Sequence, residues 1–244
     1  MAVTAPLFLV DGLPEGDRAT LAGPEGHHAA TVQRLRVGER LLLSDGRGGT
    51  ATATITAVGR STLELMVTGR RFEALPQPRL VVAQGIAKGD RAELAVQGMT
   101  EVGVDEVIPW AASRAVVRWQ GERGERAWQR WVVTAREAAK QARRSRLPVV
   151  AGPATTEVVV RRLERAAAGF VLQAGASTRL STVPVPREGE IVLVVGPEGG
   201  VAPAEVAAFE ATGAVPVRLG DPVLRASTAG VAALSVLSAR LYRW

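Results

Sequence analysis

Two glycine-containing loops near the C-terminal end of the sequence have the residue types that suit ligand binding. Gly196–Gly200 reads Gly-Pro-Glu-Gly-Gly and follows the apolar run Ile191–Val195, whereas Gly220–Arg225 follows Val215–Leu219. Glycine permits positive φ and lets a ligand lie directly against the backbone. The chemistry that such loops support is the holding and orienting of a ligand by backbone groups.

The segments around these loops predict how they are positioned. Ile191–Val195 is rich in β-branched residues and predicts a buried strand. Val215–Leu219 predicts a second apolar strand. Pro203 suits a first helical position, and Ala226–Tyr242 predicts a last helix. Each strand would end in a loop that leads into a helix, and ligands of open α/β sheets bind beyond the carboxyl ends of strands. Gly196–Gly200 alone is also typical of a structural turn, because it matches neither the phosphate-binding P-loop nor the dinucleotide motif.

Composition leaves the class of partner open between two explanations. The 244 residues suit one large or two modest domains, and 47% of them are hydrophobic, which is ample for a core. The 30 basic and 24 acidic residues give a net charge of +6, and nearly all the positive charge is arginine. A basic excess favours a nucleic-acid partner, although a GC-rich genome produces the same bias. With 4% aromatic residues, base stacking is not expected as the main binding mode.

Several function classes are excluded by residues that the sequence lacks. There is no cysteine, so disulfides, thiolate zinc sites and cysteine nucleophiles are excluded. The two histidines, His27 and His28, are adjacent, and we expect no metal site. The first ten residues do not resemble a signal peptide, and no apolar run approaches the ~18 residues of a membrane span. We therefore expect a cytoplasmic protein without a membrane segment.

The first part of the chain reads as a small β-barrel. Strands are predicted at Pro6–Val10, Leu41–Ser44, Thr50–Val58 and Leu63–Val67, separated by glycine-containing turns. A short helix is predicted between the first two of these strands, at Gly26–Arg36; from spacing alone it could cap the barrel or contact RNA. The proline-marked linker at residues 73–78 predicts a boundary between a domain of residues 1–73 and a domain of residues 74–244.

The second part predicts a parallel α/β sheet. Strands at Leu80–Gln84, Glu106–Pro109 and Gly169–Leu172 alternate with helical segments. One of these helices is expected to have Asp90 as its N-cap and to end near Gly103.

The segment from Glu125 to about Arg146 is the most basic part of the chain and predicts a helix. Its expected buried face carries Trp128, Val132, Ala135, Ala139 and Ala142. The neighbouring face carries Arg136, Lys140, Arg143 and Arg144, and Arg146 follows in a loop. Such a run is often only a solvated face. Because Glu137 is the sole acidic residue nearby, we also predict contacts with RNA phosphates.

Taken together, these motifs resemble the RsmE family of SPOUT-class RNA methyltransferases. The resemblance rests on residues 194–200, Leu219-Gly220 and residues 223–229, together with His28, Val32, Arg34 and Gly38. Members use S-adenosylmethionine (S-adenosyl-L-methionine) to methylate N3 of one uridine in the 16S rRNA of the small ribosomal subunit. The resemblance implies a PUA-like β-barrel, a SPOUT domain with a trefoil knot, and a homodimer. Ser227 and Gly98 stand where the family has Glu and Lys.

The resemblance also implies which residues form the sites. It assigns cofactor binding to Leu172, Gln173, Ala174, Val195, Gly196, Glu198, Gly199, Gly200, Leu219, Gly220, Val223, Leu224 and Ala226. With the charge pattern, it predicts RNA contacts at His28, Arg34, Arg36, Lys88, Arg136, Lys140, Gln141, Arg143, Arg144 and Arg146. Arg225 is predicted to contact the cofactor carboxylate or the uridine anion. Glu198 is either a base or a carboxylate that favours a helix N-terminus, and we prefer the second role.

Two other functions remain open at this stage. One is a different SPOUT activity, such as 2′-O-ribose methylation or methylation of another base. The other is a non-catalytic RNA-binding ribosome assembly factor, which the replacements at Ser227 and Gly98 keep open.

Overall fold

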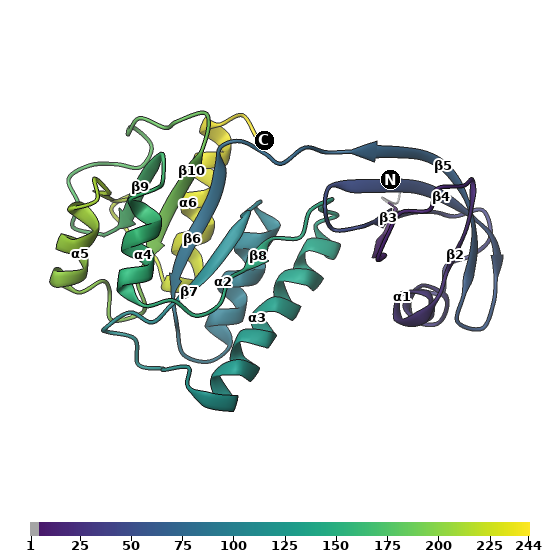
Figure 1. Cartoon of the computed structure of the whole chain (residues 1–244), viewed down its shortest axis with the longest axis horizontal. Helices are drawn as coiled ribbons and strands as arrows, with labels where there is room; N and C mark the ends of the chain where they lie inside the picture. Colours follow the sequence, from purple (N-terminus) through teal and green to yellow (C-terminus); the bar gives the residue numbers. More distant parts are fainter. Residues whose placement is uncertain (1–4) are drawn as a thin grey trace. The chain divides into compact units, whose positions relative to one another are not determined.

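A computed structural model describes residues 5–244, which form two compact units (Figure 1). The first unit runs up to Leu75 and also contains Ala139–Leu147. The second contains Pro76–Ala138 and Pro148–Trp244. The predicted boundary after residue 73 lies close to the end of the first segment at Leu75. The prediction did not include Ala139–Leu147, which also belongs to the first unit.

A curled sheet of five strands forms the first unit, in the order β1-β3-β4-β5-β2. The strands are β1 (Leu7–Leu9), β2 (Arg18–Leu21), β3 (Arg40–Ser44), β4 (Gly49–Val58) and β5 (Leu63–Phe72). Alternate residues of β4 and β5 are buried against Phe8, Leu41 and Leu43. Register shifts between β4 and β5, at Thr52/Ala53 and Ile55/Ala57, increase the local bend of the sheet.

The helical segment of the first unit begins and ends earlier than the predicted range of Gly26–Arg36. It consists of α1 (Gly23–His27) and one π-helical turn, η1 (His28–Val32). Arg34 has φ of 55°, which ends the helix before the predicted end at Arg36. Gly26 is required by packing, because a Cβ there would lie 2.5 Å from the Leu21 carbonyl oxygen.

A wholly parallel sheet of six strands forms the second unit, which confirms the α/β prediction. Its order is β11-β9-β10-β6-β7-β8. The strands are β6 (Arg79–Gly85), β7 (Glu106–Trp110), β8 (Val149–Val150), β9 (Ala168–Leu172), β10 (Glu190–Val195) and β11 (Val215–Val217). The central strand β10 pairs with β6 and β9 and is almost completely buried.

Helices cover both faces of this sheet (Figure 1). Val192 and Val194 face α4 (Thr156–Leu163) and α5 (Pro203–Glu210). Ile191 and Leu193 face α2 (Asp90–Glu101), α3 (Gly121–Gln141) and α6 (Ala226–Arg240). Burial on both sides explains why the strand reads as a continuous apolar run rather than an alternating one. None of the helices within residues 5–244 is long and apolar enough to cross a bilayer.

The structure corrects two local predictions. The N-cap of α2 is Gly89, with φ of 65°, and Asp90 is the first helical residue. In α3 the fully buried side chains include Trp131, Ala135 and Ala139, whereas Trp128 and Val132 are half-buried and Ala142 is exposed. Arg143 has φ of 54° and lies after the helix, so Arg143 and Arg144 do not continue a helical face with Arg136.

An ion network joins the N-terminal ends of three neighbouring strands. Arg79 of β6 bonds Glu106 of β7 and Glu190 of β10, at 3.0 and 2.7 Å. Arg162 of α4 bonds the same two carboxylates, both at 2.7 Å. Burial opposes the charge of Arg162, but its hydrogen bond to Glu190 and the charges of Glu106 and Glu190 outweigh that effect and raise its pKa. The network holds the edge of the sheet opposite the two glycine loops.

Candidate ligand pocket

A cavity of about 580 Å³ lies at the carboxyl edge of the sheet in the second unit. The loops after β9, β10 and β11 and the first turn of α6 line it. Pockets for small ligands and cofactors have volumes of roughly 300–1,000 Å³ and are mostly apolar. Leu172, Val195, Leu219 and Leu224 supply apolar lining here, so the cavity has the size and character of a cofactor site.

The loop after β10 is a tight turn held by its own backbone. The Gly200 nitrogen donates to the Pro197 carbonyl at 2.8 Å, and Gly200 has φ of 71°, which favours glycine. A Cβ on Gly196 would lie 3.0 Å from backbone atoms of Gly200 and Val201. The shape of this turn therefore favours glycine at positions 196 and 200.

The loop after β11 forms the second wall of the pocket. The Gln173 nitrogen donates to the Val217 carbonyl at 2.9 Å, which joins the ends of β9 and β11. Asp221 lies within 3.3 Å of the Arg218 guanidinium and 3.8 Å of that of Arg179. The loop then enters α6, whose N-cap is Arg225.

Glu198 connects the pocket to the loop between β6 and α2. Its Oε1 accepts a hydrogen bond from the backbone nitrogen of Lys88, at 3.2 Å. Glu198 is exposed, and the helix that follows, α5, begins at Pro203 with Ala202 as its N-cap. The carboxylate therefore joins two loops, and its assignment as a base or as a carboxylate that favours a helix N-terminus stays a prediction.

A buried carboxylate, Glu205 of α5, holds the loops beside the pocket in place. Its Oε1 accepts hydrogen bonds from the Ser113 nitrogen at 2.8 Å and from the Thr156 hydroxyl at 3.0 Å. Its Oε2 accepts from the Ala202 nitrogen at 3.1 Å. These bonds fix the loop after β7, where Arg114 donates to the Gly199 carbonyl at 3.3 Å. Sequence patterns gave no signal for this residue.

Two guanidinium groups in the pocket lining are not paired within the described residues. Arg225 lies at the start of α6 and Arg91 in the first turn of α2, and both are exposed. Arg218 also lines the pocket but is paired with Asp221. The pocket thus combines an apolar interior with free positive charge, an arrangement that suits a ligand with anionic groups.

The structure brings most of the predicted cofactor residues into this one pocket. The lining includes Leu172, Gln173, Ala174, Val195, Gly196, Glu198, Gly200, Leu219, Gly220, Val223, Leu224 and Ala226. Gly199 belongs to the same turn but packs against Arg114. Arg91 was not predicted from the sequence. A basic residue in the first turn of a helix that follows a strand of this sheet could have indicated it. Ser227, 6% exposed, also lines the pocket.

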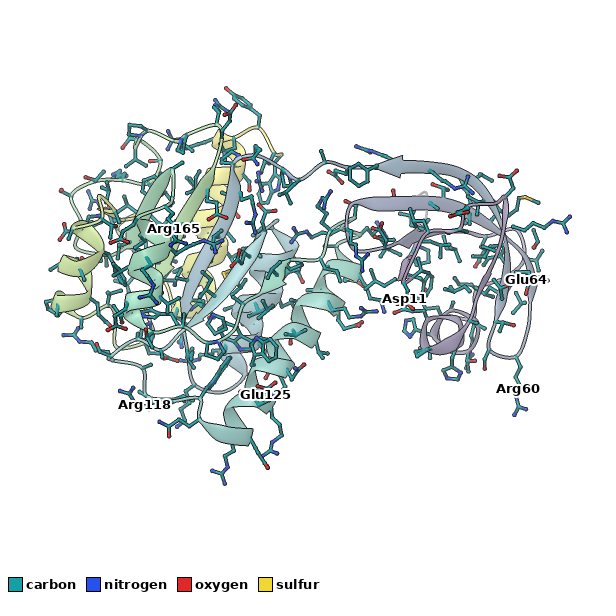
Figure 2. The ribbon with its side chains drawn as sticks, viewed as in Figure 1. Asp11, Arg60, Glu64, Arg118, Glu125 and Arg165 are labelled. Carbon is teal, nitrogen blue, oxygen red and sulfur yellow. The ribbon has the colours of Figure 1, made fainter. Side chains whose placement is uncertain are left out.

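Most of the predicted RNA contacts belong to the first unit. His28 lies in η1 with its ring edge-on to Phe8, and the Arg36 nitrogen donates to Glu39 at 3.0 Å. Arg34 follows η1 and is exposed. Arg60, which was not predicted, extends from the β4–β5 turn (Figure 2). From the basic segment, the same unit contains Lys140, Gln141, Arg143, Arg144 and Arg146. Lys88 and Arg136 belong to the second unit.

Two of these basic residues are engaged inside the first unit. Lys140 donates to Glu25 at 2.8 Å, and its side chain is only 14% exposed. Arg146 donates twice to the Glu73 carbonyl, at 2.6 and 3.1 Å, and stacks over Phe72. Lys140 therefore joins the returning segment to α1, and Arg146 joins it to the residue after β5. Both side chains already have a partner within the protein.

Comparison with known protein families covers most of the chain. A family model described as an RNA methyltransferase domain matches residues 73–238. A second, described as an RNA methyltransferase PUA domain, matches residues 21–67. The second match agrees with the PUA-like module expected for the first part of the sequence.

Curated relatives are similar along nearly the full length. Proteins named ribosomal RNA small subunit methyltransferase E from Mycobacterium bovis and Mycobacterium tuberculosis are each 43% identical to this chain. Each alignment covers 99% of this chain and 94% of the relative. The protein of the same name from Bacillus subtilis is 28% identical over 93% of this chain and 91% of its own length.

Solved structures with bound S-adenosylmethionine are similar as well. A methyltransferase of Legionella pneumophila has a TM-score of 0.85 at 28% identity, covering 98% of both chains. A ribosomal RNA small subunit methyltransferase E of Neisseria gonorrhoeae has a TM-score of 0.83 at 25% identity, covering 97% of this chain and 98% of its own. Both were solved with S-adenosylmethionine bound.

Proposed function

We propose that this chain methylates 16S rRNA with S-adenosylmethionine as the methyl donor. The chain belongs to the ribosomal RNA small subunit methyltransferase E family. The target that the resemblance gives is N3 of one uridine. The observation that carries the proposal is the pocket at the carboxyl edge of the parallel sheet. Two loops of this pocket, after β10 and after β11, contain the C-terminal motifs by which the sequence resembles the family.

The residues present fit S-adenosylmethionine. The cavity volume and the apolar lining suit a nucleoside with an apolar chain, and Gly196 and Gly220 let it lie close to the backbone of the lining. Arg225 suits its carboxylate. When bound, the cofactor supplies an electrophilic methyl group on a sulfonium. The contribution of the protein is to hold and orient both reactants, which accounts for a large part of many rate enhancements.

The position of N3 in the uracil ring determines which conformation the RNA must adopt at the target. N3 of uridine lies on the Watson–Crick edge, so the base must be unpaired or flipped out of a helix to enter the pocket. N3 must give its proton to solvent or to a base before the nitrogen attacks the methyl group. Arg225 of the lining would stabilise the resulting anion if it does not bind the cofactor. Residues of the first unit would contact the surrounding RNA backbone, namely the exposed Arg34 and Arg36 and the half-buried His28.

Three further features belong to the same proposal. A homodimer is supported by the exposed apolar side chains of Val223 and Leu224, which are 79% and 41% exposed at the pocket edge. A trefoil knot in the second unit follows from the resemblance to SPOUT enzymes. The cytoplasm is the proposed location, because ribosomal subunits are assembled there.

One experiment tests reaction and substrate together. The protein is incubated with labelled S-adenosylmethionine and either assembled small subunits or deproteinised rRNA, both from a strain lacking the enzyme. Digestion of the RNA then identifies the methylated nucleoside. 3-Methyluridine at a single site supports the proposal, and a preference for subunits indicates a late step of assembly.

Other outcomes point to the alternatives. Label on the ribose or on another base would indicate a different SPOUT activity. Absence of label together with absence of cofactor binding in calorimetry would indicate a non-catalytic assembly factor. Absence of label with the cofactor bound would indicate another RNA substrate.

A further inference from the structure

Arg91 is the one residue of the described pocket lining that comes from α2. The rest of the lining comes from the loops after β9, β10 and β11, the ends of those strands and the start of α6. Arg91 is exposed, and its guanidinium makes no hydrogen bond or ion pair with residues 5–244. It therefore stands at the open rim of the pocket with all its donors available.

The rim near Arg91 is held in place by a specific contact. The hydrogen bond from the Lys88 nitrogen to Glu198 fixes the loop that leads into α2 against the turn of the pocket. The Lys88 ammonium is also unpaired within the described residues, three positions before Arg91. This bond occupies one oxygen of Glu198, which is the one carboxylate in the described lining. The described lining has three guanidinium groups and this one carboxylate, so positive charge is in excess there.

The anionic groups of the two reactants must bind in different parts of the pocket, some in its interior and others at its rim. S-Adenosylmethionine carries one carboxylate, and Arg225 is available for it or for the N3 anion. The flipped uridine remains attached to a phosphodiester backbone that cannot follow the base into an apolar cavity. The phosphate beside the target nucleotide must therefore remain at the rim. A guanidinium there can bind two phosphate oxygens at once, which a point charge cannot.

We propose that Arg91 binds the phosphodiester adjoining the target uridine and so positions that nucleotide for methyl transfer. The proposal rests on the proposed function, since it names the part of the RNA that this site contacts. It makes Arg91 a substrate-binding residue that is not needed for binding of the cofactor.

The test compares Arg91→Ala and Arg91→Lys with a matched control, Arg165→Ala. Arg165 is an exposed arginine of the same unit, lies between α4 and β9, and is labelled in Figure 2. It precedes β9, so it lies at the opposite edge of the parallel sheet from the pocket. For each variant, calorimetry measures S-adenosylmethionine binding, and initial rates with small subunits from a strain lacking the enzyme give kcat and KM.

A second measurement does not depend on methylation. Binding of a short oligouridine to the cofactor-loaded protein is measured by fluorescence anisotropy over a range of salt concentrations. Each phosphate contact with single-stranded RNA contributes a slope of about 0.7 in a plot of log affinity against log salt. Loss of the Arg91 contact should lower the slope by that amount.

We expect Arg91→Ala to leave the cofactor Kd within about twofold, to raise KM for subunits about tenfold or more, and to lower the salt slope by about 0.7. Arg91→Lys should keep the slope but recover only part of KM, because it loses bidentate contact. Arg165→Ala should match wild type in all three measurements. A tenfold weaker cofactor affinity in Arg91→Ala would assign Arg91 to the cofactor instead.

An unchanged KM together with an unchanged salt slope would show that Arg91 is only solvated, which would also overturn the proposal. Failure of the proposed function is distinguishable from these results. It would appear as wild-type protein that does not methylate small subunits, and the salt slope of oligouridine binding would still decide whether Arg91 contacts a phosphate.

Discussion

Gly85 and Pro197 lie in direct contact, so that the end of β6 supports the turn that forms the pocket. A Cβ on Gly85 would lie 2.5 Å from the Pro197 nitrogen and 2.7 Å from its Cδ. Both distances are shorter than real Cβ contacts allow, and one partner is backbone. Only glycine lets the turn after β10 lie this close to β6, so the shape of the pocket depends on a residue that does not line it.

The first prediction follows from this contact. Gly85→Ala should push the Gly196–Gly200 turn outward and weaken S-adenosylmethionine binding at least tenfold, measured by calorimetry. Gly152→Ala is the control, because Gly152 is exposed and a Cβ there would have no neighbour within 4 Å. Equal cofactor affinity in Gly85→Ala and wild type would show that the turn can shift without disturbing the pocket.

The second prediction concerns the buried carboxylate of Glu205. In Glu205→Gln, the side-chain amide would face hydrogen-bond donors at Ser113, Thr156 and Ala202. Leaving a buried donor without an acceptor costs about 1–3 kcal/mol. We expect a loss of that size in urea unfolding, together with severalfold weaker cofactor binding, because the loop carrying Arg114 would no longer be fixed against Gly199. Glu210→Gln, on the exposed end of α5, should change neither quantity.

The sequence predicts the elements that are buried on both sides better than those that are partly exposed. Ile191–Val195 was found because a strand covered on two faces is continuously apolar. The run at 215–219 also predicted a strand correctly, although β11 is a short edge strand that is only partly buried. The edge strand β2 was missed, since Arg18–Leu21 is short and mostly exposed. The helix α4 was missed as well, because Thr156–Leu163 spans little more than two turns.

The orientation of α3 shows what periodicity alone cannot decide. Two overlapping stripes fit a helical period, one through Trp128 and Val132 and another through Trp131 and Ala138. Trp131 packs in the core beside the sheet and Ala138 is also buried, whereas Trp128 and Val132 are only half-buried. Likewise, the positive φ of Arg143 ends the helical spacing of the basic residues, and the sequence around Arg143 contains no glycine or proline that would have signalled it.

The third prediction addresses Gly98, where the family has Lys. A Cβ at this position would lie 2.8 Å from Cγ2 of Val231, at the contact between α2 and α6. Ala favours a helix interior over Gly by about 1 kcal/mol, but here the clash should cancel or exceed that gain. Gly98→Ala should therefore not stabilise the protein in urea unfolding. The double variant Gly98→Ala, Val231→Ala should show a favourable coupling energy, because the clash is removed. Additive effects of the two substitutions would contradict a direct contact.

The fourth prediction assigns a role to Arg225. Arg225→Ala should lower the rate of methyl transfer at least tenfold, because a free guanidinium at the N-cap of α6 would be lost from the pocket lining. If Arg225 binds the cofactor carboxylate, the Kd for S-adenosylmethionine should rise in proportion. If it stabilises the N3 anion, kcat should fall with little change in Kd, since such an interaction forms only as the reaction proceeds. Arg165→Ala serves as the control here too, and wild-type rates in Arg225→Ala would remove Arg225 from the site.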